Sequence, residues 1–492
     1  MHRSSTFFTG LLVLTLLMVS CQDNDNEESA SSYELLKQGF KSPPREARPR
    51  ALWDWVDGNF SLKEITREME EAVEKGMGGF DIWDVSKRVD ERNVVPAGPP
   101  FMSDAYMEGI VHAIHEAERL GLDLGLIIAS GWNAGGSWIE PRHQTMGLYR
   151  SSVTTQGGSI EKMKIPFPEL PDKAGKKGRK VQAIIKRGED GLPVYYKDIA
   201  VLAVSLKDGA VKKMVDLTDS FSPVDGITTT LPKGDWTVTR YVCTNTGQPM
   251  ISQTPNSKGP MIDHFNPEAT EFHINYFFDR LAEYLDEPVA SSGLTYLYTD
   301  SYEVVGQLWT PSLADEFKER TGYSLVPYLP VLDGFEVGDT VTTMRFMYDF
   351  RKVLSDLIIE NHYQKATEMC EERGISFVAE AAGPGWPIHN CPFESLKSSG
   401  SLSFPRGEFW HLPEDPFFSE RGGEERRQHY LQDLQVIKGV ASASHIYDQK
   451  YVEAEAFTGT HLWVEGPGDL KKTADRAFCE GLNRINFHTW PH

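Results

Sequence analysis

Residues 51–85 read ALWDWVDGNFSLKEITREMEEAVEKGMGGFDIWDV, and this stretch decides the fold. The apolar run from Ala51 to Trp55 predicts a strand. A helix should follow, with Ser61 as N-cap, Glu64 at the capping-box position and Gly76 at its end. The run GGFDIWDV then predicts a second strand. A strand, a helix and a strand with short connections indicate a right-handed crossover and therefore a parallel sheet.

The same rhythm continues through most of the chain. Eight strands are predicted, starting near Ala51, Gly79, Leu122, Leu294, Ile375, Gly400, Tyr451 and Asn483. Eight parallel strands with intervening helices close a (β/α)8 TIM-like barrel, so the expected fold class is α/β. A doubly wound open sheet is the competing architecture, but no glycine fingerprint of a dinucleotide site follows any of these strands.

An insertion interrupts the barrel pattern. Between residues 151 and 260 the sequence consists of short β-branched or aromatic runs separated by Gly, Pro and Asp, which is typical of an antiparallel sheet. We therefore expect a first barrel part over 45–150 (strands 1–3), an inserted β-rich domain over 151–260, and a second barrel part over 261–492 (strands 4–8). Nothing in the inserted domain suggests chemistry.

The N-terminus has the layout of an export signal. His2 and Arg3 precede an apolar run and then Ser20 and Cys21, which resembles a bacterial lipoprotein signal peptide over residues 1–21 with lipidation at Cys21. An acidic, flexible tether is expected over 22–44. We expect secretion and an outer-membrane lipoprotein, periplasmic or at the cell surface. A plain cleaved signal or a retained apolar anchor is the alternative.

Composition narrows the range of partners. The 492 residues carry a formal net charge of −21, which argues against a nucleic-acid partner because phosphate binding needs clustered cations. The membrane is expected to be contacted by the lipid anchor only. The chain also contains 11 Trp, 18 Tyr and 25 Phe, whose flat apolar rings suit the faces of sugars as well as a protein core.

Acids and tryptophans gather where the predicted strands end. Active sites of (β/α)8 barrels form at the C-terminal ends of the strands, and carboxylates beside indole rings fit a saccharide site. Two carboxyl groups across the scissile bond suffice for glycoside hydrolysis, and surplus acids can bind hydroxyls or a cation such as Ca²⁺. The candidate substrate-binding residues are Trp55, Asp81, Trp83, Trp132, Asn133, Asp300, Glu380, Glu408, Trp410 and His488.

The seventh predicted strand, YVEAEAFTG at 451–459, carries two buried acids. Glu453 and Glu455 share one face of the strand because side chains alternate, and a buried acid is costly unless it is paired or bound to a cation. We expect both to face the barrel lumen. Glu455 lies nearer the C-terminal mouth and is a catalytic candidate, whereas Glu453, one layer deeper, is expected to support it by hydrogen bonding.

Several of these stretches together resemble a known family. The segments WDWVDGN, GMGGFDIWDV, GLIIASGWNAGGSW, YTDSYEVVGQLWT, PRGEFW, VEAEAFT and DRAFCEGLNRINFHTW occur in an order similar to that of glycoside hydrolase family 106, the α-L-rhamnosidases. The resemblance covers most of residues 45–492. It implies inverting hydrolysis of terminal α-L-rhamnosides from plant or bacterial glycans, with calcium at the sugar site.

The resemblance also implies roles for individual residues. Glu303 and Glu455 become the catalytic pair, with Glu303 as acid and Glu455 as base. Asp300 and Glu408 become sugar or calcium contacts. Family members continue beyond the eighth strand, so this chain is expected to be a shortened form. A non-catalytic glycan-binding lipoprotein and a barrel that acts on a different deoxy or uronic sugar are the alternatives.

Overall fold

A computed structural model describes residues 24–87, 95–174, 181–304, 306, 308–381, 394–411, 423–459 and 465–492. The predicted signal peptide and Cys21 lie outside these residues. Residues 1–47 and 48–492 form two separate compact units. In the first unit, residues expected to be a flexible tether form helix α1 (Asn24–Lys41). Its side chains are nearly all exposed from Ser32 onward, so local helix propensity rather than packing accounts for this helix.

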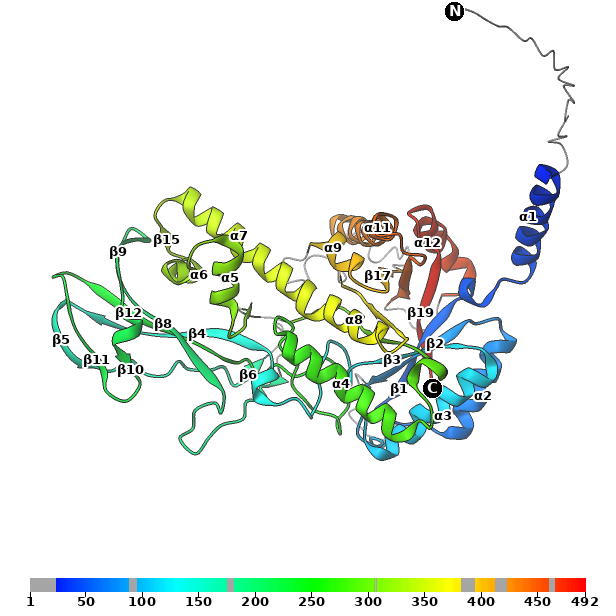
Figure 1. The fold of residues 1–492 in the computed structure, drawn as a ribbon, viewed down its shortest axis with the longest axis horizontal. Coiled ribbons are helices and arrows are strands. Elements are labelled where there is room, and N and C mark those ends of the chain that lie inside the picture. Colours follow the sequence, from blue (N-terminus) through cyan, green and yellow to red (C-terminus); the bar gives the residue numbers. More distant parts are fainter. Residues whose placement is uncertain are drawn as a thin grey trace, which may run out of the picture. The chain divides into compact units, whose positions relative to one another are not determined.

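The second unit contains a closed barrel of parallel strands, as predicted, and the inserted sheets lie to one side of it (Figure 1). In spatial order around the barrel, its strands are β1 (Arg50–Val56), β2 (Gly79–Val85), β3 (Asp123–Ile127), β13 (Leu294–Thr299), β16 (Ser376–Ala379), β17 (Phe404–Trp410), β18 (Glu453–Thr458) and β19 (Arg484–Pro491). Each predicted strand start lies within a few residues of an observed one. The strand order follows the chain, as right-handed crossovers require.

Helices surround these strands (Figure 1). Beside the barrel lie α2 (Leu62–Glu74), α3 (Asp104–Leu120), α4 (Pro267–Tyr284), α8 (Lys365–Glu371), α9 (Ser395–Gly400), α11 (Gly423–Ile446) and α12 (Pro467–Cys479). The helices α5 (Leu313–Thr321) and α6 (Leu329–Leu332) lie next to the inserted sheet, and α7 (Thr340–Ile358) begins there and leads to α8. Gly121 ends α3 in the left-handed conformation that glycine favours at a helix C-terminus. Among the described residues, no helix is long and apolar enough to cross a lipid bilayer.

The inserted domain is built from mainly antiparallel sheets. Its six-stranded sheet has the order β14-β4-β12-β8-β9-β15, with bounds β4 (Met146–Thr155), β8 (Tyr196–Lys207), β9 (Ala210–Asp216), β12 (Trp236–Asn245), β14 (Leu308–Trp309) and β15 (Glu336–Val337). Among the described strands of the inserted sheets, only β15 pairs in parallel, with β9. A three-stranded sheet joins β5 (Gly158–Met163), β10 (Phe221–Ser222) and β11 (Gly226–Leu231), and β6 (Lys173–Ala174) pairs with β7 (Val181–Gln182). The large sheet therefore begins before residue 151 and recruits strands beyond residue 260.

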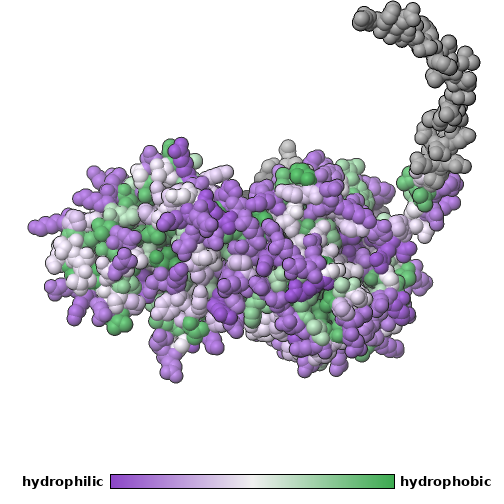
Figure 2. Space-filling model, viewed as in Figure 1, coloured by the Kyte–Doolittle hydropathy of each residue, from purple (hydrophilic) through white to green (hydrophobic). Residues whose placement is uncertain are grey.

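Two layers of apolar side chains hold the insertion in place. Val201, Ala203 and Val238 pack with Ile227 and Trp236 in a core of its own. Residues of alternate parity on β8, such as Leu202, join the large core that also contains the barrel. The face in Figure 2 is mostly hydrophilic with small apolar groups, in keeping with the acidic composition.

Candidate active site

The lower part of the barrel lumen is filled by a buried ion cluster. Glu453 forms ion pairs with Arg406 at 2.6 Å, Arg484 at 2.5 Å and Arg50 at 3.7 Å. Burial by itself would raise the pKa of Glu453, but Arg484, Arg406 and Arg50 together lower it to about 2. Glu453 is therefore a supporting ion-pair partner in the lumen, deeper than the mouth.

Asp81 belongs to this same cluster. Its Oδ2 accepts hydrogen bonds from Arg406 Nη2 at 2.6 Å and from Asn486 Nδ2 at 2.8 Å, and Tyr296 donates its hydroxyl to Oδ1. Asp81 is fully buried. The prediction that Asp81 contacts substrate is wrong, because it lies near the start of β2 and its charge is already satisfied by the cluster.

The prediction that Trp55 binds substrate is also wrong. Arg50 reaches the lumen from β1, so side chains of opposite parity on this strand face the helices. The Trp55 ring packs against Phe60 at 4.8 Å and against Tyr106 of α3 at 5.5 Å, and it is completely buried. It is part of the core between barrel and helices.

A carboxylate cluster lies above the ion cluster, at the C-terminal ends of the strands. Asp300 after β13, Glu380 after β16 and Glu455 on β18 bring carboxylate oxygens within 4.8 Å of one another. Glu408 on β17 is in register with Glu455 on the neighbouring strand. These four acids, which the sequence analysis singled out, come from or directly follow four different barrel strands.

Burial and mutual repulsion perturb these acids. Burial, and next the charge of Glu455, raise the pKa of Asp300 to about 7. Burial, followed by the charges of Asp300, Glu408 and Glu455, raises the pKa of Glu380 well above its usual range. Glu380 Oε1 is buried and has no hydrogen-bond partner among the described residues. The carboxylates of this cluster therefore repel one another, and a bound cation or a proton would reduce this repulsion.

Glu455 is held in a defined orientation within this cluster. Its Oε1 accepts a hydrogen bond from Thr458 Oγ1 at 2.7 Å, and His488 Nε2 lies 3.7 Å from the same atom. Glu455 is only 5% exposed. The fixed rotamer and the adjacent imidazole are suited to a carboxylate that exchanges a proton with a water or a hydroxyl group.

Glu303 lies four residues beyond the end of β13, in a segment without regular secondary structure. Its Oε1 accepts a hydrogen bond from Ser301 Oγ at 3.1 Å. The charges of both Glu303 and Glu455 act on Asp300, so Asp300 is electrostatically coupled to both predicted catalytic residues. Ser301, which the sequence did not single out, lies two residues from Glu303 in the same short segment.

Aromatic side chains line one side of the mouth. The Trp83 ring lies 6.0 Å from the Trp132 ring and 5.7 Å from the His488 ring, centroid to centroid. Trp83 Nε1 donates to the carbonyl of Gly131 at 3.1 Å, which fixes the indole. Trp410 is half-buried at the end of β17. The predicted substrate-binding residues Trp83, Trp132 and His488 are therefore brought together.

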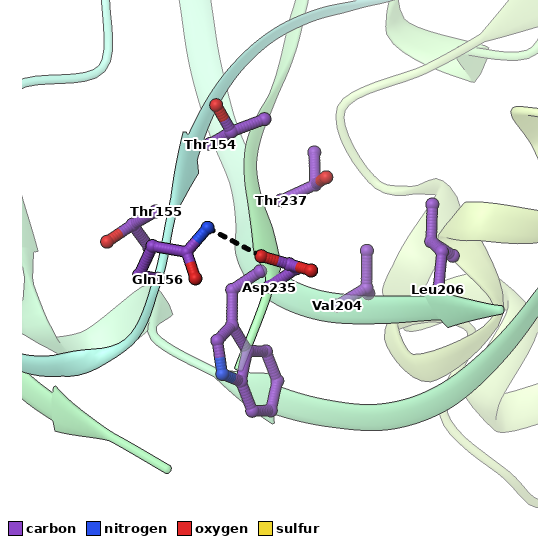
Figure 3. A pocket seen from close by; sticks show the side chains of 8 residues that line it. Thr154, Thr155, Gln156, Val204, Leu206, Asp235 and Thr237 are labelled. Carbon is purple, nitrogen blue, oxygen red and sulfur yellow. Dashed lines mark hydrogen bonds between the residues drawn. The ribbon is translucent and has the colours of Figure 1, made fainter. Parts of the chain in front are cut away.

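A separate pocket of about 410 Å³ lies on the inserted sheet. Its lining comes from β4, β8, β12 and the residues next to them, and Gln156 Nε2 donates to Asp235 Oδ1 at 2.6 Å across it (Figure 3). None of the predicted site residues lines this pocket, so it is distinct from the barrel mouth.

A closed (β/α)8 barrel whose mouth combines clustered carboxylates with indole rings defines a carbohydrate-active barrel protein. A sequence model of the α-L-rhamnosidase family, glycoside hydrolase family 106, matches residues 41–213 and 207–492. The chain belongs to this family.

The similar proteins carry different names. A protein of Formosa agariphila named a putative beta-glucuronidase is 29% identical over 93% of this chain and 38% of its own length. The structure of a rhamnosidase from Novosphingobium sp. PP1Y superposes with a TM-score of 0.73 and 22% identity, over 93% of this chain and 56% of that one. A beta-galactosidase from Halorubrum lacusprofundi gives a TM-score of 0.45 and 11% identity, over 89% of this chain and 52% of that one. The chain thus spans well under two thirds of these relatives' lengths.

Proposed function

We propose that the protein hydrolyses terminal α-L-rhamnosides of plant or bacterial glycans with inversion of configuration. The observation that carries the proposal is the convergence of Asp300, Glu380 and Glu455 at the barrel mouth, beside the segment that bears Glu303. Family membership supports rhamnose as the sugar.

Two glutamates divide the proton transfers. Glu303 donates a proton to the glycosidic oxygen as the bond to the leaving group breaks. Glu455, held by Thr458, removes a proton from the water that attacks the anomeric carbon from the opposite face. Stacking on Trp83 and Trp132 orients the sugar ring, and charge on the surrounding acids favours the oxocarbenium-like transition state.

Calcium is part of the proposal. Asp300 and Glu380 offer hard oxygen ligands close enough to hold a single cation, with the proposed base Glu455 as their neighbour, and Glu380 Oε1 has no other partner among the described residues. Glu408, which the sequence analysis placed in the metal site with Asp300, lies beside this group without being one of its three members. A bound Ca²⁺ supplies positive charge that holds sugar hydroxyls and offsets the repulsion between the acids.

The catalytic assignment is tested with Glu303→Gln and Glu455→Gln on aryl α-L-rhamnosides. Each variant should lower kcat by about 10²-fold or more, and Glu303→Gln should lose least on a substrate whose leaving group needs no protonation. Circular dichroism confirms folding, and ¹H NMR of the first product should show the β-anomer. Wild-type turnover by both variants, or an α-anomer formed first, contradicts the assignment.

Calcium binding is tested by thermal melting of the EDTA-treated protein. Added Ca²⁺ should raise the Tm of the wild type and should have little effect on Asp300→Asn, because ligand binding stabilises the folded state only where the site is intact. Mg²⁺ at the same concentration is the control. Equal responses of both proteins would show that this cluster does not bind the ion.

The name of the Formosa agariphila protein favours one second candidate, a uronic sugar. A panel of aryl glycosides that includes a β-glucuronide distinguishes the two sugars. Tryptophan fluorescence titrated with rhamnose, beside the same assay, identifies the remaining alternative, a glycan-binding protein that releases no product.

A further inference from the structure

The backbone of Glu303 is held on both sides by side chains from distant segments. Its N–H donates to Asn133 Oδ1 at 2.9 Å, and its carbonyl accepts from Gln248 Nε2 at 3.3 Å. Since residues 300–304 belong to no helix or strand, these two side-chain amides replace the backbone pairing that would otherwise fix the segment.

Asn133 is presented by a rigid loop. It is 1% exposed and adopts a left-handed φ of 72°. A Cβ at nearby Gly131 would lie 1.9 Å from the carbonyl oxygen of Ile251, and one at Gly135 would lie 2.3 Å from that of Pro260. The loop after β3 is therefore pressed against residues 251–260, which fixes the direction in which the Asn133 amide points.

Gln248 is held with comparable firmness and comes from the inserted domain. It lies three residues after the end of β12 and is 3% exposed. Its backbone N–H donates to Thr246 Oγ1 at 3.2 Å, and its carbonyl accepts from the Met261 N–H at 3.1 Å. The side chain therefore starts from a fixed backbone and reaches the Glu303 carbonyl.

We propose that Gln248 is a positioning residue for Glu303, supplied by the inserted β-domain and working together with Asn133. The proposal rests on the catalytic role of Glu303 in the proposed function. Neither amide acts on the reacting atoms. Both set the place of the Glu303 carboxyl, and a displacement of about 1 Å in a catalytic group can cost about 10²-fold in rate. The insertion thereby contributes to catalysis.

The test compares Gln248→Met with Gln144→Met in the full chain. Methionine keeps the length of the side chain and removes its amide. Gln144 is a matched control, because it is also buried and its Nε2 donates to a backbone carbonyl, that of Ile139, at 3.0 Å. Gln248→Met should lower kcat about 10-fold or more with little change in KM, and should show the leaving-group dependence of Glu303→Gln. Gln144→Met should keep the wild-type kcat.

A double-mutant cycle separates positioning from a general loss of structure. In the Glu303→Gln background, Gln248→Met should cause almost no further loss, since the group that it positions is gone. Thermal melting of each protein reports folding, and Gln248→Glu, which loses the donor but keeps the size, replaces Gln248→Met if that variant does not fold.

The outcomes distinguish this inference from the proposed function. A wild-type kcat in Glu303→Gln overturns the role of Glu303 and this inference with it. If Glu303→Gln is impaired but Gln248→Met matches Gln144→Met, the inference is wrong and the proposed function stands. An equal loss from Gln248→Met in both backgrounds would also refute positioning.

Discussion

At the scale of single residues, the pKa values of the buried acids of the barrel differ according to their surroundings. Glu453, paired with three arginines, has a pKa lowered to about 2, whereas burial raises the pKa of Asp84 to about 7 despite hydrogen bonds from Ser130, Tyr106 and Thr254. Asp84 is on β2 next to Trp83, so its hydrogen bonds connect the barrel, α3 and the insertion. Charge on Asp84 therefore opposes folding.

Asp84→Asn should become relatively more stabilising as pH rises. The folded pKa of Asp84 is about 7 and the unfolded value is near 3.8, so its contribution to stability is fully present below pH 3.8 and is lost as pH rises through 7. Between pH 5 and 7, the free energy of unfolding of the variant should increase relative to that of the wild type by about 1.4 kcal/mol per pH unit. Between pH 7 and 8 the difference should level off. Urea denaturation at each pH measures the free energy of unfolding of both proteins. The control Asp475→Asn, at an exposed position of α12, should show the same pH dependence of the free energy of unfolding as the wild type. If the curve of Asp84→Asn also runs parallel to that of the wild type, the raised pKa of Asp84 is refuted.

At the scale of elements, the loop after β3 connects the barrel with the insertion. Gly131 donates its N–H to the carbonyl of Asp84 at 2.6 Å, and Trp132 donates to that of Ile251 at 3.1 Å. Gly131 has a positive φ of 77°. Only glycine combines this conformation with so close an approach of two backbones, so Gly131 is required for the packing of the loop.

Gly131→Ala should destabilise the protein and disturb the site. Its Cβ would overlap the Ile251 carbonyl, so we expect a loss of about 3 kcal/mol or more in urea denaturation, together with a lower kcat because Asn133 moves. Gly439→Ala on α11 is the control. A Cβ there meets nothing within 4 Å, and alanine in a helix should add up to about 1 kcal/mol. Equal stability of the two variants would contradict this account.

At the scale of the whole molecule, the barrel and the insertion jointly form the site. Four barrel strands supply the carboxylates, and the insertion supplies Gln248 to the backbone of Glu303. We also propose that a lipid on Cys21 anchors the protein to the outer membrane, on the strength of the N-terminal sequence.

The Cys21→Ala variant tests this anchoring. In a bacterial host, the wild type should incorporate labelled palmitate and sediment with membranes, whereas the variant should do neither, because no acyl chain is attached. Retention of rhamnosidase activity in the variant is the control for folding. An unlabelled wild type would indicate a plain cleaved signal if it does not sediment with membranes, and a retained apolar anchor if it does.

The sequence by itself determined the barrel and the acids of its mouth. Strand and helix periods are local properties, so the eight strands were predictable, and strand ends necessarily converge at one rim. Asp300, Glu380, Glu408 and Glu455 followed from that rule.

Only the tertiary structure decided which face of each strand meets the lumen and which distant segments meet Glu303. A period of two groups side chains but does not say which group points inward, so Trp55 was predicted in the site with Trp83 although it packs against helices. The sequence also did not show how deep an acid lies in the lumen. Asp81 lies in the buried ion cluster, whereas Asp300 lies in the carboxylate cluster above it. The contact of Gln248 with Glu303 joins residues 55 positions apart and leaves no periodic signal, because it depends on how the insertion folds back onto the barrel.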